Sequence, residues 1–352
     1  MSRKAILNIV KLLVAATIVV VLVKANDWDA IRSNLAGMDM TDWGLGLAAM
    51  FLAYCLSMVR WRMLMNSVGI EASFFDAFRL GFIGALFNNL VPGLTGGDVI
   101  KAVYVAKEQP GKRADAVLTV FVDRGLGIVA LALIAAVIIP LDFERYRQAA
   151  WGIYGFLALA SVGGAVVLSR RIKARIRRLA GLDKSDGKVA RLIDRFDRAV
   201  SIYRERLDVI GWSLLVGACV HLLIIVAIWL FAGAIAKGNI AALPDGGLGD
   251  PQAVATLESL GDMGLSVHCS VVPIIMIISA LPIAPAGWGV GDAAFAYFYE
   301  AAGTTADLAL ALSFAYRLTA TLLSLLGLPF LLMDRKQVLS VAKEAEGGEE
   351  LV

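Results

Sequence analysis

Charged residues are scarce in this sequence, and those present are clustered. Only 18% of the 352 residues are Asp, Glu, Lys or Arg, whereas soluble domains carry about 25%. Stretches such as residues 5–23 and 125–140 hold almost no charge. With 59% hydrophobic residues and a mean hydropathy of +0.75, the chain has too little polar surface for a soluble fold. The composition therefore predicts a polytopic, all-α integral membrane protein.

Cysteine and histidine are also scarce. The three cysteines, Cys55, Cys219 and Cys269, stand in apolar segments without the spacing of a zinc site or a disulfide framework. Only two histidines, His221 and His268, are present. We therefore expect no metal site and no cofactor. The net charge of +3 is too small to indicate binding to nucleic acid.

Hydrophobic runs of about 20 residues, the length of a helix that crosses a bilayer, recur along the chain. The six predicted full spans are residues 5–23, 43–59, 116–140, 150–169, 209–235 and 308–333. The first run is long for the apolar core of a signal peptide, so we interpret it as a retained span. A single membrane domain, residues 1–333, is then followed by an acidic cytoplasmic tail, residues 334–352.

The positions of lysine and arginine predict the orientation of the chain in the membrane. Residues 170–208 carry 13 Lys and Arg against 6 Asp and Glu, an excess typical of cytoplasmic loops. Residues 236–266 carry four acids and one lysine, as expected of an external loop. Arg60, Trp61 and Arg62 follow the second predicted span and fit a cytoplasmic interface. We therefore place both termini in the cytoplasm and the protein in the cytoplasmic (inner) membrane, and we expect the basic loop to attract anionic headgroups.

Two apolar segments, residues 74–106 and 267–302, are interrupted by proline and glycine. The interrupting residues are Pro92, Gly93, Gly96 and Gly97 in the first, and Pro282, Pro285, Gly287, Gly289 and Gly291 in the second. Irregular backbone at membrane depth is tolerated only where it is buried in protein or lines a water-filled cavity. We predict that both segments are re-entrant helical hairpins, which brings the hydrophobic segments to eight.

The two broken segments take corresponding positions in two halves of the chain. Asp98 follows the first break and precedes Arg124 by 26 residues, and Asp292 follows the second and precedes Arg317 by 25 residues. The charge rule gives the halves opposite orientations, a pattern that points to a transporter binding site. Two unrelated Gly/Pro kinks are the alternative. The predicted inverted repeats are residues 1–140 and 150–333.

Arg124 and Arg317 lie inside predicted spans, where a charge is costly and faces a partner or a cavity. Arginine presents a rigid fork of donors that suits phosphate. Both residues are therefore candidates to hold an anionic headgroup, with Lys101 as a third cation. The alternative is a structural ion pair, in which Arg124 contacts Asp98 or its neighbour Asp123.

Asp98 and Asp292 each stand where a half-helix is predicted to begin, and two roles stay open for them. One is a helix cap, whose carboxylate accepts the first free N–H groups. The other is a coupling carboxylate that binds a proton or a cation during transport. Glycines at these helix starts leave N–H groups open to an anion, and two amides precede the first break. These further substrate-site candidates are Gly96, Gly97, Gly287, Gly289, Asn88 and Asn89.

Aromatic and acidic residues near the predicted membrane surfaces leave further alternatives. Trp288, Tyr297 and Tyr299 are candidates for packing on a lipid or sugar, or for anchoring the chain at the interface. Asp27 and Asp29 follow the first predicted span. They are either a solvated helix end or the general base or metal ligand of a lipid-linked sugar transferase.

Four stretches of sequence resemble a known family. The runs FNNLVPGLTGGDVIK, VDRGLG, LPIAPAGWGVGD and SFAYRLTATLLSLLG are similar to the flippase-like membrane domain of lysylphosphatidylglycerol synthases. The similarity covers about residues 5–333. The residues that occupy motif positions are Asn89, Pro92, Gly96, Gly97, Asp98, Arg124, Pro285, Gly287, Gly289 and Arg317.

The resemblance implies that the chain moves an anionic or modified lipid, such as aminoacylated phosphatidylglycerol or a polyprenyl-linked glycan, between leaflets. The sequence departs from the family pattern at two places: Lys101 stands where arginine is usual, and Gly291-Asp292 stands where Arg-Glu is common. One cation expected near the second break is therefore missing. The resemblance does not extend to a soluble aminoacyl-transferase domain, so we expect that the chain does not make lysyl-lipid by itself.

The sequence thus favours a lipid flippase, not an enzyme, that holds a phosphate between Arg124, Arg317 and Lys101. Its expected partner is an anionic phospholipid or a polyprenyl-phosphate-linked lipid, and its oligomeric state stays open. One rival is a membrane-embedded transferase that depends on Asp27 and Asp29. The other is a non-transporting scaffold that recruits partners through residues 170–208.

Overall fold

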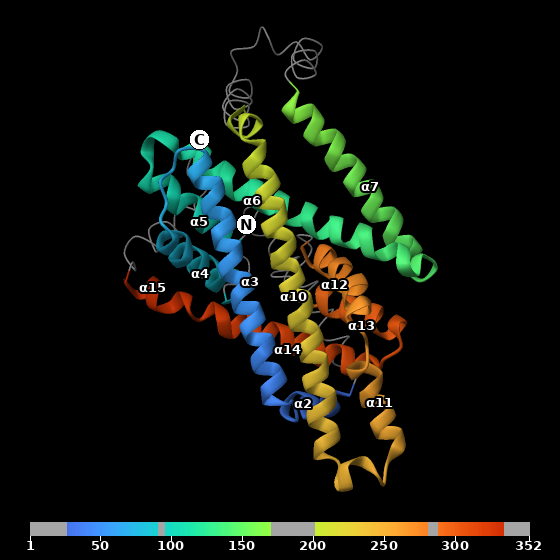
Figure 1. Ribbon diagram of the computed structural model, residues 1–352. Coiled ribbons are helices and arrows are strands. Elements are labelled where there is room, and N and C mark those ends of the chain that lie inside the picture. Colours follow the sequence, from blue (N-terminus) through green and yellow to red (C-terminus); the bar gives the residue numbers. More distant parts are fainter. Residues whose placement is uncertain (1–26, 91–95, 170–200, 281–287, 334–352) are drawn as a thin grey trace, which may run out of the picture. The chain divides into compact units, whose positions relative to one another are not determined.

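A computed structural model of the chain describes residues 27–90, 96–169, 201–280 and 288–333 (Figure 1). Within these ranges every regular element is a helix, which confirms the predicted all-α fold class. The α-helices are α2 (Trp28–Ala36), α3 (Met40–Ser67), α4 (Phe74–Leu90), α5 (Gly96–Glu108), α6 (Arg113–Ile138), α7 (Phe143–Leu168), α10 (Leu207–Ala242), α11 (Pro251–Gly261), α12 (Leu265–Ala280), α13 (Val290–Ala302), α14 (Ala306–Ser324) and α15 (Gly327–Met333). The short 3-10 helices are η1 (Pro110–Lys112), η2 (Ile139–Asp142) and η4 (Pro244–Gly247).

Within the described ranges, five stretches are long and apolar enough to cross a membrane. Each of them coincides with a predicted span. They are Met40–Ser67, Arg113–Leu141, Phe143–Val166, Leu207–Ala242 and Ala306–Met333. The predicted span at residues 5–23, most of the basic loop and the acidic tail lie outside the described residues.

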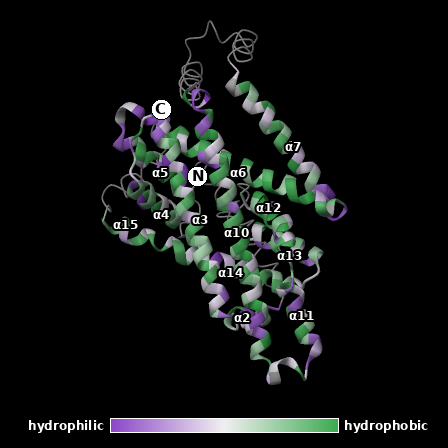
Figure 2. Ribbon diagram, in the orientation of Figure 1, coloured by the Kyte–Doolittle hydropathy of each residue, from purple (hydrophilic) through white to green (hydrophobic). Residues whose placement is uncertain are grey.

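The long helices carry apolar side chains on their outer surfaces. Along α7, Trp151 and Leu159 are exposed, and in α6 Phe121 and Val137 are exposed as well. Figure 2 shows hydrophobic residues along both helices and hydrophilic residues at the turn that joins them. Because large apolar side chains in water are unfavourable, these surfaces fit contact with lipid tails. The chain is a multi-pass membrane protein.

The described residues form two compact units, which are treated separately below. Unit 1 comprises Met1–Cys55, Ala85–Gly96 and Cys219–Leu328, and unit 2 comprises Leu56–Gly84, Gly97–Ala218 and Pro329–Val352. Each unit contains segments from both predicted repeats. The inverted repeat over residues 1–140 and 150–333 stays a prediction.

In unit 1 the second broken segment consists of two separate helices that pack together. Helix α13 contacts both α12 and α14, and α14 also contacts α2. The edge of the Trp28 ring meets Phe314, with 5.4 Å between the centroids. Two half-helices in contact are what a helical hairpin requires, while its re-entrant placement in the membrane stays a prediction.

In unit 2 the two helices of the first broken segment approach each other through glycine. A Cβ atom at Gly97 of α5 would overlap the carbonyl oxygen of Gly84 in α4. Backbone therefore touches backbone at this point. Helices α6 and α7 also contact each other and are joined by η2 (Figure 1).

The predicted external loop, residues 236–266, is largely helical. Helix α10 continues to Ala242, and α11 begins after Asp250, whose carboxylate accepts the N–H of Ala253 at 3.0 Å. Asp250 followed by Pro251 is a typical helix start. From the sequence alone, this region is interpreted as a loop because many glycines surround it. Helices α11 and α12 together also satisfy the criteria for one span, bent by 67°.

The contact between Gly84 and Gly97 makes a stability prediction. Replacing Gly97 with Ala should force α4 and α5 apart, since the new Cβ would overlap a backbone oxygen. We expect Gly97→Ala to lower the Tm of the purified protein by several degrees. Gly152→Ala in α7, whose Cβ would meet nothing within 4 Å, is the control. An unchanged Tm for Gly97→Ala would contradict the close approach.

Candidate functional site

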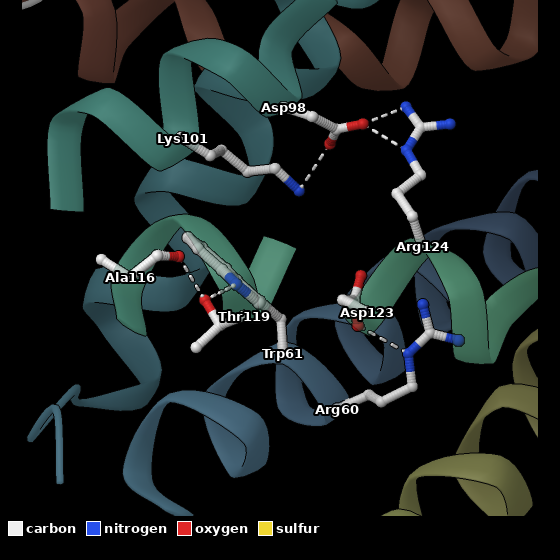
Figure 3. A network of polar contacts seen from close by, with 8 residues as sticks. All are labelled: Arg60, Trp61, Asp98, Lys101, Ala116, Thr119, Asp123 and Arg124. Carbon is white, nitrogen blue, oxygen red and sulfur yellow. Dashed lines mark hydrogen bonds and ion pairs between the residues drawn. The ribbon is translucent and has the colours of Figure 1, made fainter. Parts of the chain in front are cut away.

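In unit 2, one carboxylate is shared by two cations. Asp98 is the third residue of α5, and Lys101 follows it by one turn. The Lys101 ammonium lies 3.1 Å from Asp98 Oδ1. Arg124, in α6, donates to Asp98 Oδ2 through Nε and Nη2. Figure 3 shows the two cations converging on the carboxylate from different helices.

The balance of charge at this cluster leaves a surplus of positive charge. One carboxylate (−1) and two cations (+2) give a net charge of +1. The Arg124 side chain is 54% exposed, whereas those of Lys101 and Asp98 are 15% and 21% exposed. Arg124 is therefore the most accessible of the three charged side chains, and a competing anion would reach it first.

Asp123, the other predicted partner of Arg124, pairs with Arg60 instead. The distance from Arg60 Nε to Asp123 Oδ1 is 2.8 Å, and both residues are buried. Helix α3 continues to Ser67, past the predicted end of the span, and it buries both Arg60 and Trp61. Their position at the cytoplasmic interface stays a prediction. The apolar run ends at residue 59, but the helix continues beyond it, because Arg60 can be buried there by pairing with Asp123. In the sequence, the only indication of this buried ion pair was the Arg60-Trp61 dipeptide directly after an apolar run.

Unit 1 holds a second carboxylate and arginine, and the carboxylate of this pair is buried. Asp292 Oδ1 accepts from Arg317 Nε at 2.5 Å and from the Ser313 hydroxyl at 2.6 Å. Its Oδ2 accepts the N–H of Gly289 at 2.8 Å. The Asp292 side chain is only 2% exposed. The carboxylate is thus neutralised and hydrogen-bonded at both oxygens.

Asp292 caps α13, but from inside the helix and not from the residue before its first turn. Gly289, with φ of 77°, precedes the first residue of α13, so Asp292 caps the helix from its third position. A positive φ favours glycine, which accounts for that residue without a ligand. The coupling role of Asp98 and Asp292 stays a prediction.

Gly291 stands where the resemblance implies an arginine, and the structure has little space for a side chain there. A Cβ at Gly291 would lie 2.6 Å from Ser279 Oγ and 2.7 Å from Arg317 Nη2. The guanidinium of Arg317 also lies 4.8 Å from the centre of the Trp288 ring. Arg317 and Ser279 therefore fill the space that a side chain at position 291 would need.

The other predicted substrate-site residues have varied surroundings. Asn89 donates to the Ala85 carbonyl within its own helix at 3.0 Å, and Asn88 near the end of α4 is half-buried. Gly96 begins α5, Gly97 serves the contact with Gly84, and Gly287 lies outside the described residues. Arg124 and Arg317 belong to different units, so their joint clamp on one phosphate stays a prediction.

The three aromatic candidates have separate positions. Tyr299 is fully buried and stacks on Phe295 with 5.7 Å between centroids. The predicted role of Tyr299 in lipid contact or interface anchoring was therefore wrong. Tyr297 is exposed, as an interface anchor would be, and Trp288 packs on Arg317.

Asp27 is a helix cap. Its carboxylate accepts the N–H groups of Asp29 and Ala30, each at 3.0 Å, and its own N–H donates to Asp307 at 3.1 Å. This is the solvated helix end that the sequence left open as an alternative to a general base. In the described part of the chain, no group of three or more His, Cys, Asp and Glu residues is arranged to hold a metal ion.

The different burial of the two carboxylates predicts different effects of Asp→Asn. Asp292→Asn removes the charge of a buried carboxylate that accepts from Arg317, Ser313 and Gly289, and breaking a buried ion pair costs about 3–5 kcal/mol in comparable cases. Asp98→Asn removes a less deeply buried carboxylate, whose partner Arg124 is 54% exposed, and should lower the free energy of unfolding by less than Asp292→Asn does. Thermal unfolding of both variants in detergent measures the difference. Equal losses of Tm would contradict this assignment.

The comparisons with known proteins agree with the helical architecture. The family described as "Lysylphosphatidylglycerol synthase TM region" matches residues 8–237, more than half of the chain. The match ends before α12, α13 and α14. The chain is also 30% identical over 128 residues to the "UPF0104 membrane protein PH1989" of Pyrococcus horikoshii. That alignment spans 35% of this chain and 37% of the relative. The chain belongs to the family of the lysylphosphatidylglycerol synthase transmembrane region.

Proposed function

We propose that this protein binds the phosphate of an anionic lipid at Asp98, Lys101 and Arg124 and moves that lipid between the leaflets of the cytoplasmic membrane. The observation that carries the proposal is the net charge of +1 on a partly exposed cluster. The acyl chains would remain in the bilayer. An anionic phospholipid and a polyprenyl-phosphate-linked lipid share the chemistry that this cluster recognises.

The proposed binding step is an exchange of anions on Arg124. Its guanidinium has five N–H donors in a planar fork that matches phosphate, and Asp98 engages the donors on Nε and Nη2. A phosphate arriving at the exposed side of Arg124 would form charge-assisted hydrogen bonds that are stronger than neutral ones. Asp98 would then stay with Lys101, 3.1 Å away. The site would open for a lipid without leaving a carboxylate unpaired.

Arg317 is a weaker candidate for this exchange. Its partner Asp292 accepts two further hydrogen bonds, from Ser313 and Gly289. Opening the pair would leave a buried carboxylate short of its cation, which is costly. We therefore assign lipid binding first to the cluster in unit 2.

Transport fits the residues better than catalysis does. The rival transferase needs Asp27 as a general base, and this carboxylate caps α2. In contrast, interrupted helices with an ionic cluster beside the break are typical of transporter binding sites. Helices α4 and α5 flank such a break, and Asp98 follows it. We therefore propose that the protein is not an enzyme.

The anion exchange predicts the effect of removing either cation. Arg124→Gln and Lys101→Gln should each slow the translocation of fluorescent phosphatidylglycerol in proteoliposomes about tenfold, the equivalent of roughly 1.4 kcal/mol. Lys237→Gln removes the same charge at an exposed side chain that pairs with Asp39 and Asp42, and it should translocate normally. Wild-type rates for both Arg124→Gln and Lys101→Gln would refute the site.

The proposed orientation has its own test. In a variant without native cysteines, Ser185→Cys reports on the basic loop and Leu248→Cys on the opposite side, where Leu248 is exposed. A membrane-impermeant maleimide should label Leu248→Cys in intact cells and Ser185→Cys only in inverted vesicles. Labelling of Ser185→Cys from outside would reverse the orientation and remove the basis for the inverted repeat.

A further inference from the structure

Two consecutive residues of α3, Arg60 and Trp61, are bonded to the same face of α6. Arg60 Nε lies 2.8 Å from Asp123 Oδ1, and Trp61 donates from its indole nitrogen to the Thr119 hydroxyl at 3.2 Å. Thr119 and Asp123 are four residues apart, so they lie one above the other on α6. The two bonds fix both the height and the rotation of α6 against α3.

These four side chains have little freedom to move. All of them are buried, and the Thr119 hydroxyl donates to the Ala116 carbonyl at 2.7 Å. A Cβ at Gly127 would lie 3.3 Å from Arg60 Nη2, and a Cβ at Gly217 would lie 3.0 Å from Arg60 Nη1. The guanidinium of Arg60 is thus enclosed by α6 and α10.

Arg60 and Trp61 each act on one cation of the proposed lipid site: Arg60 on Arg124, through Asp123, and Trp61 on Lys101. Arg124 follows Asp123, and successive helical side chains point about 100° apart. Holding Asp123 against α3 therefore turns Arg124 towards Asp98 on α5, as Figure 3 shows. The ring of Trp61 lies 4.9 Å from the ammonium of Lys101, within the range of a cation–π contact.

We propose that Arg60 and Trp61 are positioning residues that hold Arg124 and Lys101 in the geometry that a phosphate needs. This proposal rests on the proposed function of the same site. Neither residue touches the lipid: Arg60 acts through Asp123, and Trp61 acts through its ring face. Binding sites lose performance when their groups are displaced by about 1 Å, because the supporting residues set the geometry.

A purely structural role makes a different prediction for the buried ion pair. Replacing a buried pair with apolar residues of similar volume is often neutral or stabilising. If Arg60 and Asp123 served only stability, Arg60→Met/Asp123→Leu would leave lipid binding intact. If they position Arg124, the same double variant stays folded and loses affinity.

The experiment titrates phosphatidylglycerol into the purified full-length protein in detergent and measures the apparent Kd by native mass spectrometry. Phosphatidylcholine measures binding that does not depend on net charge, and Tm reports the fold. We expect about tenfold weaker phosphatidylglycerol binding for Arg60→Met/Asp123→Leu, with Tm unchanged or raised. We expect Trp61→Phe to weaken binding about threefold, because a phenyl ring attracts a cation less strongly than an indole.

A double-mutant cycle separates positioning from a general effect on the fold. In an Arg124→Gln background, Arg60→Met/Asp123→Leu should cause no further loss of affinity, since the residue that the pair positions is already gone. An equal further loss in that background would overturn the positioning role of Arg60.

A matched pair of threonines controls for the hydrogen bond to tryptophan. Trp43 donates to Thr319 at 3.1 Å, and Thr319 donates to the Ala315 carbonyl at 2.8 Å, which repeats the chemistry of Trp61 and Thr119 in unit 1. We expect Thr119→Val to weaken phosphatidylglycerol binding about twofold to threefold and Thr319→Val to leave it unchanged. This comparison also serves if Arg60→Met/Asp123→Leu fails to fold.

The outcomes distinguish this inference from the proposed function. Normal binding by Trp61→Phe, Thr119→Val and any folded Arg60→Met/Asp123→Leu, with weakened binding by Arg124→Gln and Lys101→Gln, would overturn the positioning role alone. Normal binding by Arg124→Gln and Lys101→Gln would overturn both proposals.

Discussion

A charge inside an apolar helix needs a partner of opposite sign, and this constraint governs the polar structure of the molecule. Taking an ion out of water costs several kcal/mol, which is recovered only through an opposite charge and further hydrogen bonds. Arg60, Arg124 and Arg317 each meet one aspartate, and each pair lies within one compact unit. The degree of burial then separates their roles. Arg60 is buried with its partner and Arg317 is 13% exposed beside a buried aspartate, whereas Arg124 is 54% exposed.

Glycine provides the space in which these pairs form. Gly84 and Gly97 let α4 and α5 touch through their backbones, and a Cβ at Gly84 would also lie 3.0 Å from the stem of Lys101. Gly291 leaves room for the guanidinium of Arg317 in the same way. Close packing therefore explains the glycines near the breaks. The predicted role, in which they leave backbone N–H groups open to an anion, is a second explanation. Close packing and ligand access are compatible at these helix starts.

The asymmetry between the two arginine sites supports one working interpretation of the protein. The cluster around Asp98 carries surplus positive charge and partial exposure, as a phosphate site requires, whereas Asp292 is 2% exposed and is paired with Arg317. The family match supports a membrane function for the chain but names no transported lipid. The proposal of lipid transport therefore rests on the charge and exposure of Lys101 and Arg124.

The sequence by itself determined the all-α membrane class, the five described spans, the two interrupted segments and the corresponding positions of Asp98 with Arg124 and of Asp292 with Arg317 in the two halves. These features follow from local hydropathy and from the cost of charge in lipid, which neighbouring residues set. Only the tertiary structure decided that Asp123 belongs to Arg60 and Asp98 to Arg124, and that Tyr299 is buried. Arg60 and Asp123 are 63 residues apart in the chain. Their pairing depends on how α3 and α6 are rotated against each other, and that rotation is fixed by packing between distant segments.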